Sequence, residues 1–229
     1  MRLIFVRHGE PDYENNCLTP LGHKQAEVLV ERLKDEGITE IHTSKLGRAI
    51  QTAEPIAAYL GLEINTHGFI NEIGGSSIDG TELPEGGHPW RMAKHLAKNG
   101  FDLMRSDWAE AEPYCHSKLV EGYDRVAEGI DTFLAECGYT REGKYYRVGE
   151  KTKKTVALFS HCASSTAALA RIFNLPMSMA ITAIVPRHTA VTVVIIDGKP
   201  GSLVVPTIEI MNDARHIVGI ETDGIMLDK

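Results

Sequence analysis

The apolar positions of this chain form short continuous runs and longer periodic stretches, and two of the runs are alike. Residues 3–6 are apolar and end at Arg7 and His8, and residues 155–159 are apolar and end just before His161. A short apolar run that ends in polar residues is typical of a buried strand that opens into a loop. We therefore predict two buried strands, each of which delivers a histidine to the loop that follows it.

Apolar residues recur at helical spacing in several other stretches. The first follows Thr19 and a proline, a pair that is typical of a helix start. A second helix is expected to begin at Ser44, which places Arg48 in its early turns. Further helices are expected over residues 163–173 and along the apolar stripe of residues 119–137.

More strands are expected between these helices. Residues 38–43 and 63–71 have strand-like composition, and residues 191–196 and 203–210 flank a turn rich in glycine and proline that predicts a hairpin. Strands that alternate with helices indicate the α/β class. We predict a three-layer α/β/α fold with a mixed, mainly parallel sheet.

We interpret residues 1–229 as a single domain with a cap or lid inserted at about residues 81–117. This region is rich in glycine and proline, and only residues 90–97 look helical. A basic stretch over residues 144–154 is expected to form a loop or hairpin. Aromatic and histidine side chains make the insertion a candidate specificity lid, although such side chains also serve as packing. They are His88, Trp90, Trp108, Tyr114 and His116.

Composition excludes several classes of partner. Apolar residues make up 43% and charged residues 24% of the 229 residues, as in an ordinary globular protein. The formal net charge of -7 argues against nucleic acid and anionic membranes as partners, because both are negatively charged. No apolar run approaches the roughly 20 residues of a membrane span, and the first residues lack the features of a signal peptide. We therefore expect a soluble, cytoplasmic protein whose scattered cysteines are reduced.

The two strand-ending histidines are expected to share one site, because ligands of open α/β sheets bind beyond the carboxyl ends of the strands. Arg7 adjoins His8, and Arg48 lies near a predicted helix start, where backbone N–H groups and the helix dipole favour an anion. A guanidinium group pairs with two phosphate oxygens at once. Two arginines with His8 and His161 therefore suit a phosphoryl group.

Three motifs carry a resemblance to a known family. Residues 7–10 are Arg-His-Gly-Glu, residues 43–53 are Thr-Ser-Lys-Leu-Gly-Arg-Ala-Ile-Gln-Thr-Ala, and residues 160–161 are Ser-His before a helix of small residues. In this order, and together with residues 18–26, they resemble the histidine phosphatase superfamily in its phosphoglycerate-mutase-like branch. The resemblance implies a phosphoglycerate mutase-like fold.

The resemblance also implies a role for each of the four basic residues. His8 would be the nucleophile that becomes phosphohistidine, and Arg7, Arg48 and His161 would hold the transferred oxygens. General chemistry agrees, because a neutral imidazole is nucleophilic at physiological pH and fixed cations stabilise the transition state. We therefore expect neither a metal nor another cofactor.

The leaving group needs a proton, and Glu72 is the candidate general acid. In the segment Asn-Glu-Ile-Gly-Gly of residues 71–75 it resembles the acidic residue of the family, although residues 76–80 replace the family's usual tryptophan-containing continuation. Other loop carboxylates remain possible substitutes. They are Glu10, Asp79, Glu82 and Glu85.

Asn15 and Cys162 complete the predicted phosphate-binding set. The family has an asparagine slightly closer to its first motif than Asn15 or Asn16, and Cys162 stands where a glycine commonly follows the second histidine. The cysteine side chain could narrow the pocket. Arg187 and His188 precede the last strands, where they could reach a substrate or form a surface loop.

Three functions stay open. A phosphatase that acts on a small phosphorylated metabolite is favoured over a phosphoglycerate mutase, because the Glu-Arg-His-Tyr segment of true mutases is missing after the acidic position. A non-catalytic module that binds a phosphorylated ligand should have lost His8, the acid or an arginine; the four basic residues are all present, and the open identity of the acid keeps this alternative. A metal hydrolase is disfavoured, because the ten histidines form none of the usual metal-binding spacings. The substrate and the oligomeric state, a homodimer included, are left open.

Overall fold

The computed structural model describes residues 1–149 and 154–220, and a six-stranded sheet runs through its centre. The order of the strands is β11-β9-β1-β8-β4-β5. Strands β1, β8, β4 and β5 pair in parallel, whereas β9 runs antiparallel to both of its neighbours. The predicted mixed, mainly parallel sheet is therefore confirmed. The bounds are β1 Arg2–Arg7, β4 Glu40–Ser44, β5 Ile64–His67, β8 Thr155–Ser160, β9 Val191–Ile195 and β11 Thr207–Asp213.

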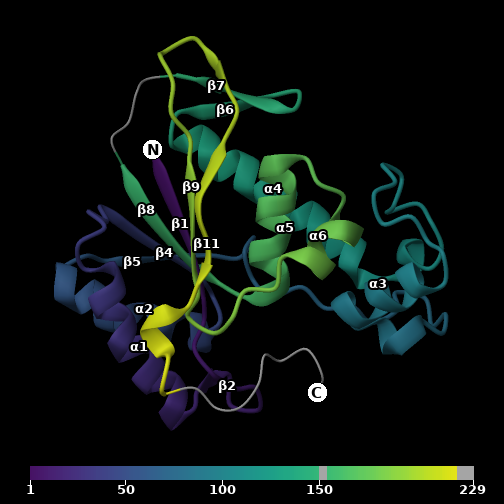
Figure 1. Cartoon of the computed structure of the whole chain (residues 1–229), viewed down its shortest axis with the longest axis horizontal. Helices are drawn as coiled ribbons and strands as arrows, with labels where there is room; N and C mark the ends of the chain where they lie inside the picture. Colours follow the sequence, from purple (N-terminus) through teal and green to yellow (C-terminus); the bar gives the residue numbers. More distant parts are fainter. Residues whose placement is uncertain (150–153, 221–229) are drawn as a thin grey trace.

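Helices cover both faces of the sheet, as Figure 1 shows. The alternating side chains of β1 point to two separate cores, since successive residues of a strand face opposite sides. Ile4 and Val6 pack in the core of α1 and α2, whereas Leu3 and Phe5 pack in the core that includes α4 and α5. The three-layer prediction is therefore confirmed. The helices are α1 Pro20–Leu33, α2 Gly47–Leu60, α4 Lys118–Glu136, α5 Cys162–Phe173 and α6 Met177–Ala183.

The start of α1 follows the predicted cap. The Thr19 hydroxyl accepts a hydrogen bond from the Gly22 N–H at 3.1 Å and donates one to the Glu10 carboxylate at 3.0 Å. These two bonds hold the first turn of α1 against the loop that follows β1. Local sequence therefore determines this helix start.

We expect Thr19→Ala to lower the free energy of unfolding by about 1 kcal/mol, because an N–H of the first turn loses its acceptor. Thr19→Ser keeps the hydroxyl and is expected to retain most of the stability. Urea unfolding of the two variants and the unaltered protein measures both effects. Equal losses in the two variants would show that the Thr19 methyl group, and not the cap, matters.

The inserted region lies beside the main body, with α3 at the far right of Figure 1. It contains the short helices η1 Pro84–Gly87 and η2 Tyr114–His116 and the helix α3 Pro89–Lys98, which packs against α6. Trp108 and Tyr114 are buried and make an edge-to-face contact, with ring centroids 5.4 Å apart. These two aromatic residues therefore pack inside the protein. That the region acts as a lid stays a prediction.

The second helix begins later than expected. Ser44 is the last residue of β4, and α2 begins at Gly47. The Ser44 side chain accepts a hydrogen bond from the Leu46 N–H at 3.2 Å, so it closes the turn between the strand and the helix. The prediction that Ser44 starts the helix is wrong because its hydroxyl serves this turn.

The predicted C-terminal hairpin is more complex than expected. Strand β11 does pair antiparallel with β9, but the residues between them form β10 Leu203–Val204, which pairs with β7 Tyr145–Val148. Strand β7 also forms a hairpin with β6 Tyr139–Glu142, so residues 145–148 of the basic stretch belong to a small sheet. Residues 150–153 of that stretch lie outside the described residues. Short strands β2 Pro11–Asp12 and β3 Cys17–Leu18 and the short helix η3 Arg215–Ile217 complete the elements.

Within residues 1–149 and 154–220, every helix is too short or too polar to cross a bilayer.

Candidate active site

Two neighbouring strands bring His8 and His161 together. Strands β1 and β8 are parallel, and Arg7 lies opposite Ser160 in their register. The residue that follows each strand is a histidine, so both histidines lie at the same edge of the sheet. The His8 N–H donates to the Ser160 carbonyl at 2.9 Å, and the two imidazole centroids are 5.0 Å apart.

The surroundings of His8 keep its ring neutral and orient it. The side chain is 1% exposed. Burial, followed by the charge of Arg7 and by His161, holds the pKa of His8 well below its usual value. Nδ1 lies 2.6 Å from the Gly9 carbonyl oxygen, which can only accept, so Nδ1 carries the ring hydrogen. The neutral ring then has its lone pair on Nε2.

Close backbone packing fixes the loop that carries His8. A Cβ atom on Gly9 would lie 2.7 Å from the Gly22 carbonyl oxygen of α1, so only glycine allows this approach. The Gly9 N–H donates to the Thr52 hydroxyl of α2 at 3.0 Å. The loop is therefore fixed by both helices on one face of the sheet.

Two buried arginines flank the histidines. Arg7 is 5% exposed and donates from Nη1 to the Pro186 carbonyl at 2.7 Å. Arg48 is 7% exposed, lies in the first turn of α2 and donates from Nη1 to the Asn16 side chain at 2.9 Å. The Nε atoms of both arginines are buried and have no hydrogen-bond partner among the described residues. Buried N–H groups are seldom left unpaired, so these two favour an anionic ligand at the site.

His161 caps α5 and is hydrogen-bonded to β4. Its Nε2 lies 2.7 Å from the Ser44 hydroxyl oxygen, and burial together with Arg48 and Arg7 holds the pKa of His161 well below its usual value. When Ser44 donates its hydroxyl hydrogen to Nε2, the neutral ring carries its own hydrogen on Nδ1. Nδ1 is buried and has no partner in the part of the chain that the structure describes. In that tautomer His161 offers a further N–H donor.

Glu72 is the carboxyl group of the cluster. It is half-buried in the irregular segment after β5, and its Oε1 accepts from the Ile73 N–H at 2.9 Å and the Ser164 N–H at 3.1 Å. Burial raises the pKa of Glu72, although these N–H groups and the charges of Arg7 and Arg48 oppose the rise. Because both hydrogen bonds go to Oε1, Oε2 is the oxygen that can carry a proton.

Asn15 and Asn16 lie in different surroundings. The Asn15 side chain is exposed and donates to the Asp12 carboxylate at 2.8 Å, which closes a local turn. The Asn16 side chain accepts from Arg48. The structure therefore places Asn16, and not Asn15, against the basic cluster. Asn16 has positive φ, a backbone state that the sequence pattern did not reveal.

Cys162 lies beside the cluster as the first residue of α5. It is 2% exposed, and burial raises the pKa of its thiol to about 11. The thiol is therefore protonated at neutral pH and packs as a small apolar group.

Two of the substitute carboxylates have partners elsewhere. The Asp79 carboxylate binds the His116 ring at 2.6 Å in the inserted region. Glu10 accepts from the Thr19 hydroxyl at the start of α1. Glu72, by contrast, lies close enough to Arg7 and Arg48 for their charges to act on its pKa.

His188 also lies in the cluster, whereas the sequence left open whether it reaches the site or forms a surface loop. Its ring centroid lies 5.8 Å from that of His8, and burial together with Arg7 and Arg187 lowers the pKa of His188 to about 3. The Thr189 N–H donates to the Arg7 carbonyl at 3.0 Å, because β9 runs antiparallel beside β1. Only this strand order, which the sequence did not specify, brings residue 188 to the site.

Comparison with known proteins agrees with the geometry. A model of the histidine phosphatase superfamily (branch 1) matches residues 3–208. A probable phosphoglycerate mutase of Yersinia enterocolitica is 35% identical over 82 residues, and one of Photorhabdus laumondii is 40% identical over 82 residues. Each of these matches covers 32% of this chain and only 38% of the relative.

Solved structures share the fold over nearly the whole chain. The phosphoserine phosphatase of Entamoeba histolytica, in complex with 3-phosphoglyceric acid, has a TM-score of 0.62 at 20% identity and covers 94% of this chain and 98% of its own. The α-ribazole phosphatase of Shigella flexneri has a TM-score of 0.61 at 19% identity, with coverage of 93% and 97%. A mycobacterial glucosyl-3-phosphoglycerate phosphatase has a TM-score of 0.62 at 19% identity, with coverage of 92% and 98%.

Proposed function

This chain belongs to the histidine phosphatase superfamily, and we propose that it is a metal-independent phosphatase that hydrolyses a small phosphomonoester through a phosphohistidine on His8. The observation that carries the proposal is the fixed tautomer of His8. Its Nδ1 hydrogen is held by the Gly9 carbonyl, so the lone pair of a neutral ring is available on Nε2. A neutral imidazole with a fixed lone pair is a competent nucleophile.

In the first step the Nε2 lone pair of His8 attacks phosphorus, and the ester P–O bond breaks. The oxygen of the leaving group takes the proton from Oε2 of Glu72. Because the pKa of Glu72 is raised, a fraction of the protein molecules keep this carboxyl group protonated at pH values above the usual titration range of a glutamate. A general acid requires this proton.

The negative oxygens of the transferred group would be held by the basic side chains. Arg7 and Arg48 supply two positive charges, and the Nε groups of both arginines, which are buried and unpaired among the described residues, are available as donors. Preorganised donors of this kind stabilise developing charge by several kcal/mol in a buried site. This charge does the work that a metal ion does in other phosphatases.

In the second step, the ionised Glu72 takes a proton from water, and the resulting hydroxide attacks phosphorus. The P–N bond to His8 breaks, and inorganic phosphate leaves. The same carboxyl group thus gives and regains one proton in each cycle, so the enzyme returns to its starting state.

Two features favour hydrolysis over transfer to a second hydroxyl. The solved structures of similar fold named above are described as phosphatases. In addition, residues 74–80 after Glu72 are Gly-Gly-Ser-Ser-Ile-Asp-Gly, which offers no basic side chain to keep a phosphoglycerate in place. A phosphoglycerate mutase remains the second candidate because relatives that are 35% and 40% identical over 82 residues bear that name.

We expect the purified protein to hydrolyse p-nitrophenyl phosphate in excess EDTA and, with water labelled with oxygen-18, to release phosphate that contains one labelled oxygen. Quenched samples should contain an acid-labile, alkali-stable phosphoprotein. Activity that is lost only with EDTA would contradict the metal-free mechanism. Conversion of 3-phosphoglycerate to its isomer without labelled phosphate would indicate a mutase, and phosphate binding without turnover or labelling would indicate a binding module.

A further inference from the structure

The segment that carries Glu72 has little regular structure of its own. It follows β5, and one backbone hydrogen bond, from the Asn71 N–H to the Gly68 carbonyl at 3.2 Å, closes its first turn. A general acid must be held to within a fraction of an ångström to protonate a leaving group efficiently. Groups outside the segment therefore have to hold Glu72 in place.

Helix α4 supplies these groups from one face. Gly122, Arg125 and Gly129 are spaced by three and four residues, so they lie on the same side of the helix. A Cβ atom on Gly122 would lie 2.3 Å from the Ile73 side chain, and one on Gly129 would lie 2.2 Å from the Phe69 side chain. The two glycines thus let residues 69–73 lie directly on the helix.

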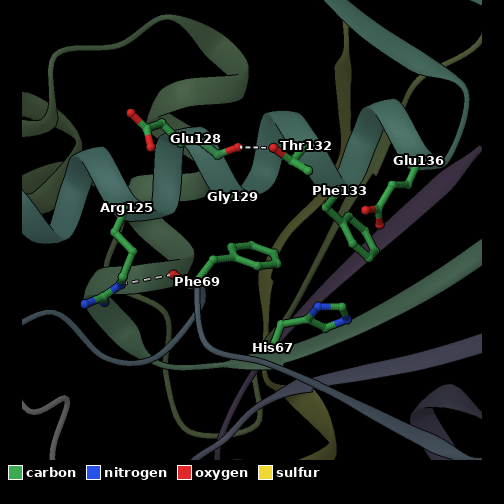
Figure 2. Close-up of a pocket in the computed structure, with 8 residues that line it drawn as sticks. All are labelled: His67, Phe69, Arg125, Glu128, Gly129, Thr132, Phe133 and Glu136. Atoms are coloured by element: carbon green, nitrogen blue, oxygen red, sulfur yellow. Dashed lines mark hydrogen bonds between the residues drawn. The ribbon is translucent and has the colours of Figure 1, made fainter.

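Arg125 lies between these glycines and binds the backbone of the segment. Its Nη2 donates to the Asn71 carbonyl at 2.8 Å and the Glu72 carbonyl at 3.3 Å, and its Nε donates to the Phe69 carbonyl at 3.4 Å. Arg125 and Phe69 both line a cavity of about 570 Å³, and Figure 2 shows the hydrogen bond between the Arg125 guanidinium and the Phe69 carbonyl oxygen. A planar guanidinium spreads five donors over three nitrogens in a fixed geometry, whereas an ammonium group carries its three donors on one nitrogen and spans a smaller set of carbonyls.

The residues on either side of Glu72 are held by other groups. Before Glu72, the Lys45 N–H donates to the Asn71 side chain at 2.9 Å. Downstream, the Ser117 hydroxyl donates to the Gly75 carbonyl at 3.1 Å, and the Lys118 N–H donates to the Ser76 carbonyl at 2.9 Å. Among the described residues, Arg125 is thus the side chain that binds the main chain of Glu72 itself.

We propose that Arg125 is a positioning residue, which holds the main chain of residues 69–72 so that the Glu72 carboxyl faces the leaving group. The proposal rests on the proposed function, in which Glu72 is the general acid. The printed hydrogen bonds of Arg125 go to main-chain carbonyls of this segment, so its effect on the reaction would pass through Glu72. Its loss should therefore impair proton donation more than phosphoryl binding.

The test compares two aryl phosphates. p-Nitrophenolate leaves readily without a proton, whereas the more basic phenolate needs one, so a defect in general acid catalysis slows phenyl phosphate more. We expect Arg125→Ala to lower kcat/KM for phenyl phosphate by about 10- to 100-fold and that for p-nitrophenyl phosphate several-fold less. Arg125→Lys keeps the charge but loses the planar set of donors that reaches all three carbonyls. Its rates should lie between those of the unaltered protein and of Arg125→Ala, and it replaces the alanine variant if that variant does not fold.

Glu128→Ala is the matched control, because Glu128 is an exposed charged residue one turn further along α4 whose carboxylate makes no hydrogen bond among the described residues. It should leave both rates unchanged. Glu72→Gln is the reference for loss of the acid. Suppose that Glu72→Gln lowers kcat/KM more for phenyl phosphate than for p-nitrophenyl phosphate. If the Arg125 variants then lower kcat/KM equally for both substrates, or for neither, the positioning role is wrong. If Glu72→Gln itself shows no such dependence, the proposed role of Glu72 fails first, whatever the Arg125 variants do.

Discussion

Replacement of His8 by alanine is expected to lower kcat/KM for p-nitrophenyl phosphate by on the order of 10⁴- to 10⁶-fold, the loss typical of a missing covalent nucleophile. The reason is that Nε2 of His8 would form the bond to phosphorus, because the Gly9 carbonyl holds the ring hydrogen on Nδ1. The neighbouring His161 has its Nε2 hydrogen-bonded to Ser44. The measurement is steady-state turnover in EDTA, together with phosphoprotein labelling.

The matched control for this variant is His23→Ala. His23 is exposed on α1, which also packs near the loop of His8, so the change removes an imidazole without touching the cluster. Its activity and labelling should equal those of the unaltered protein. The arginines remain in the His8 variant, so it should still bind inorganic phosphate. Turnover within tenfold of the unaltered protein, or labelling that persists, would contradict the nucleophilic role of His8.

The second large effect is expected for Glu72→Gln. The amide has nearly the same shape and can still accept from the Ile73 and Ser164 N–H groups, so the fold of the segment should persist. It cannot donate a proton to an alkoxide. We expect kcat/KM for phenyl phosphate to fall by about 10²- to 10⁴-fold, the usual contribution of a general acid.

The pH profile of the same variant tests the sign of the pKa shifts. kcat/KM reports the free enzyme and the first step, for which Glu72 must be protonated and His8 neutral. Because the pKa of Glu72 is raised, activity toward phenyl phosphate should persist above the usual range of a glutamate and fall as the pH rises through that pKa. Because the pKa of His8 is lowered, the acidic fall should lie below pH 6.5. Glu72→Gln should remove the alkaline fall and leave the acidic one, and an unchanged alkaline fall would assign it to another group.

Elements set by neighbouring residues were predicted well. Residues 3–6 and 155–159 lie within β1 and β8, and the cap at Thr19 starts α1, because apolar runs and capping hydrogen bonds are local features. The stripe of residues 119–137 coincides with α4 to within a residue or two at each end. These patterns, with the three motifs, were enough to identify the fold class and the family.

Predictions failed where distant residues compete for one group. The sequence predicts that α2 starts at Ser44. In the structure the Ser44 hydroxyl instead binds the Leu46 N–H of the strand-to-helix turn and the ring of His161, which lies more than a hundred residues away in the chain. The sequence predicts a simple hairpin after β9. In the structure the chain between β9 and β11 also forms β10, which pairs with β7 of the small sheet. The phosphate contact predicted for Asn15 stays a prediction, and only the loop conformation decides that Asn16 is the asparagine that meets Arg48.

The sequence by itself determined which side chains could take part, because the residues at the ends of the apolar runs and in the three motifs are visible without coordinates. Only the tertiary structure decided how they meet. The parallel pairing of β1 with β8 brings His8 to His161, and the antiparallel β9 adds His188. Burial then lowers the pKa of His8 and raises that of Glu72, and the face of α4 supports the segment of Glu72. These properties depend on solvent exclusion and on contacts between residues far apart in the chain, which the order of residues along one strand or helix does not contain.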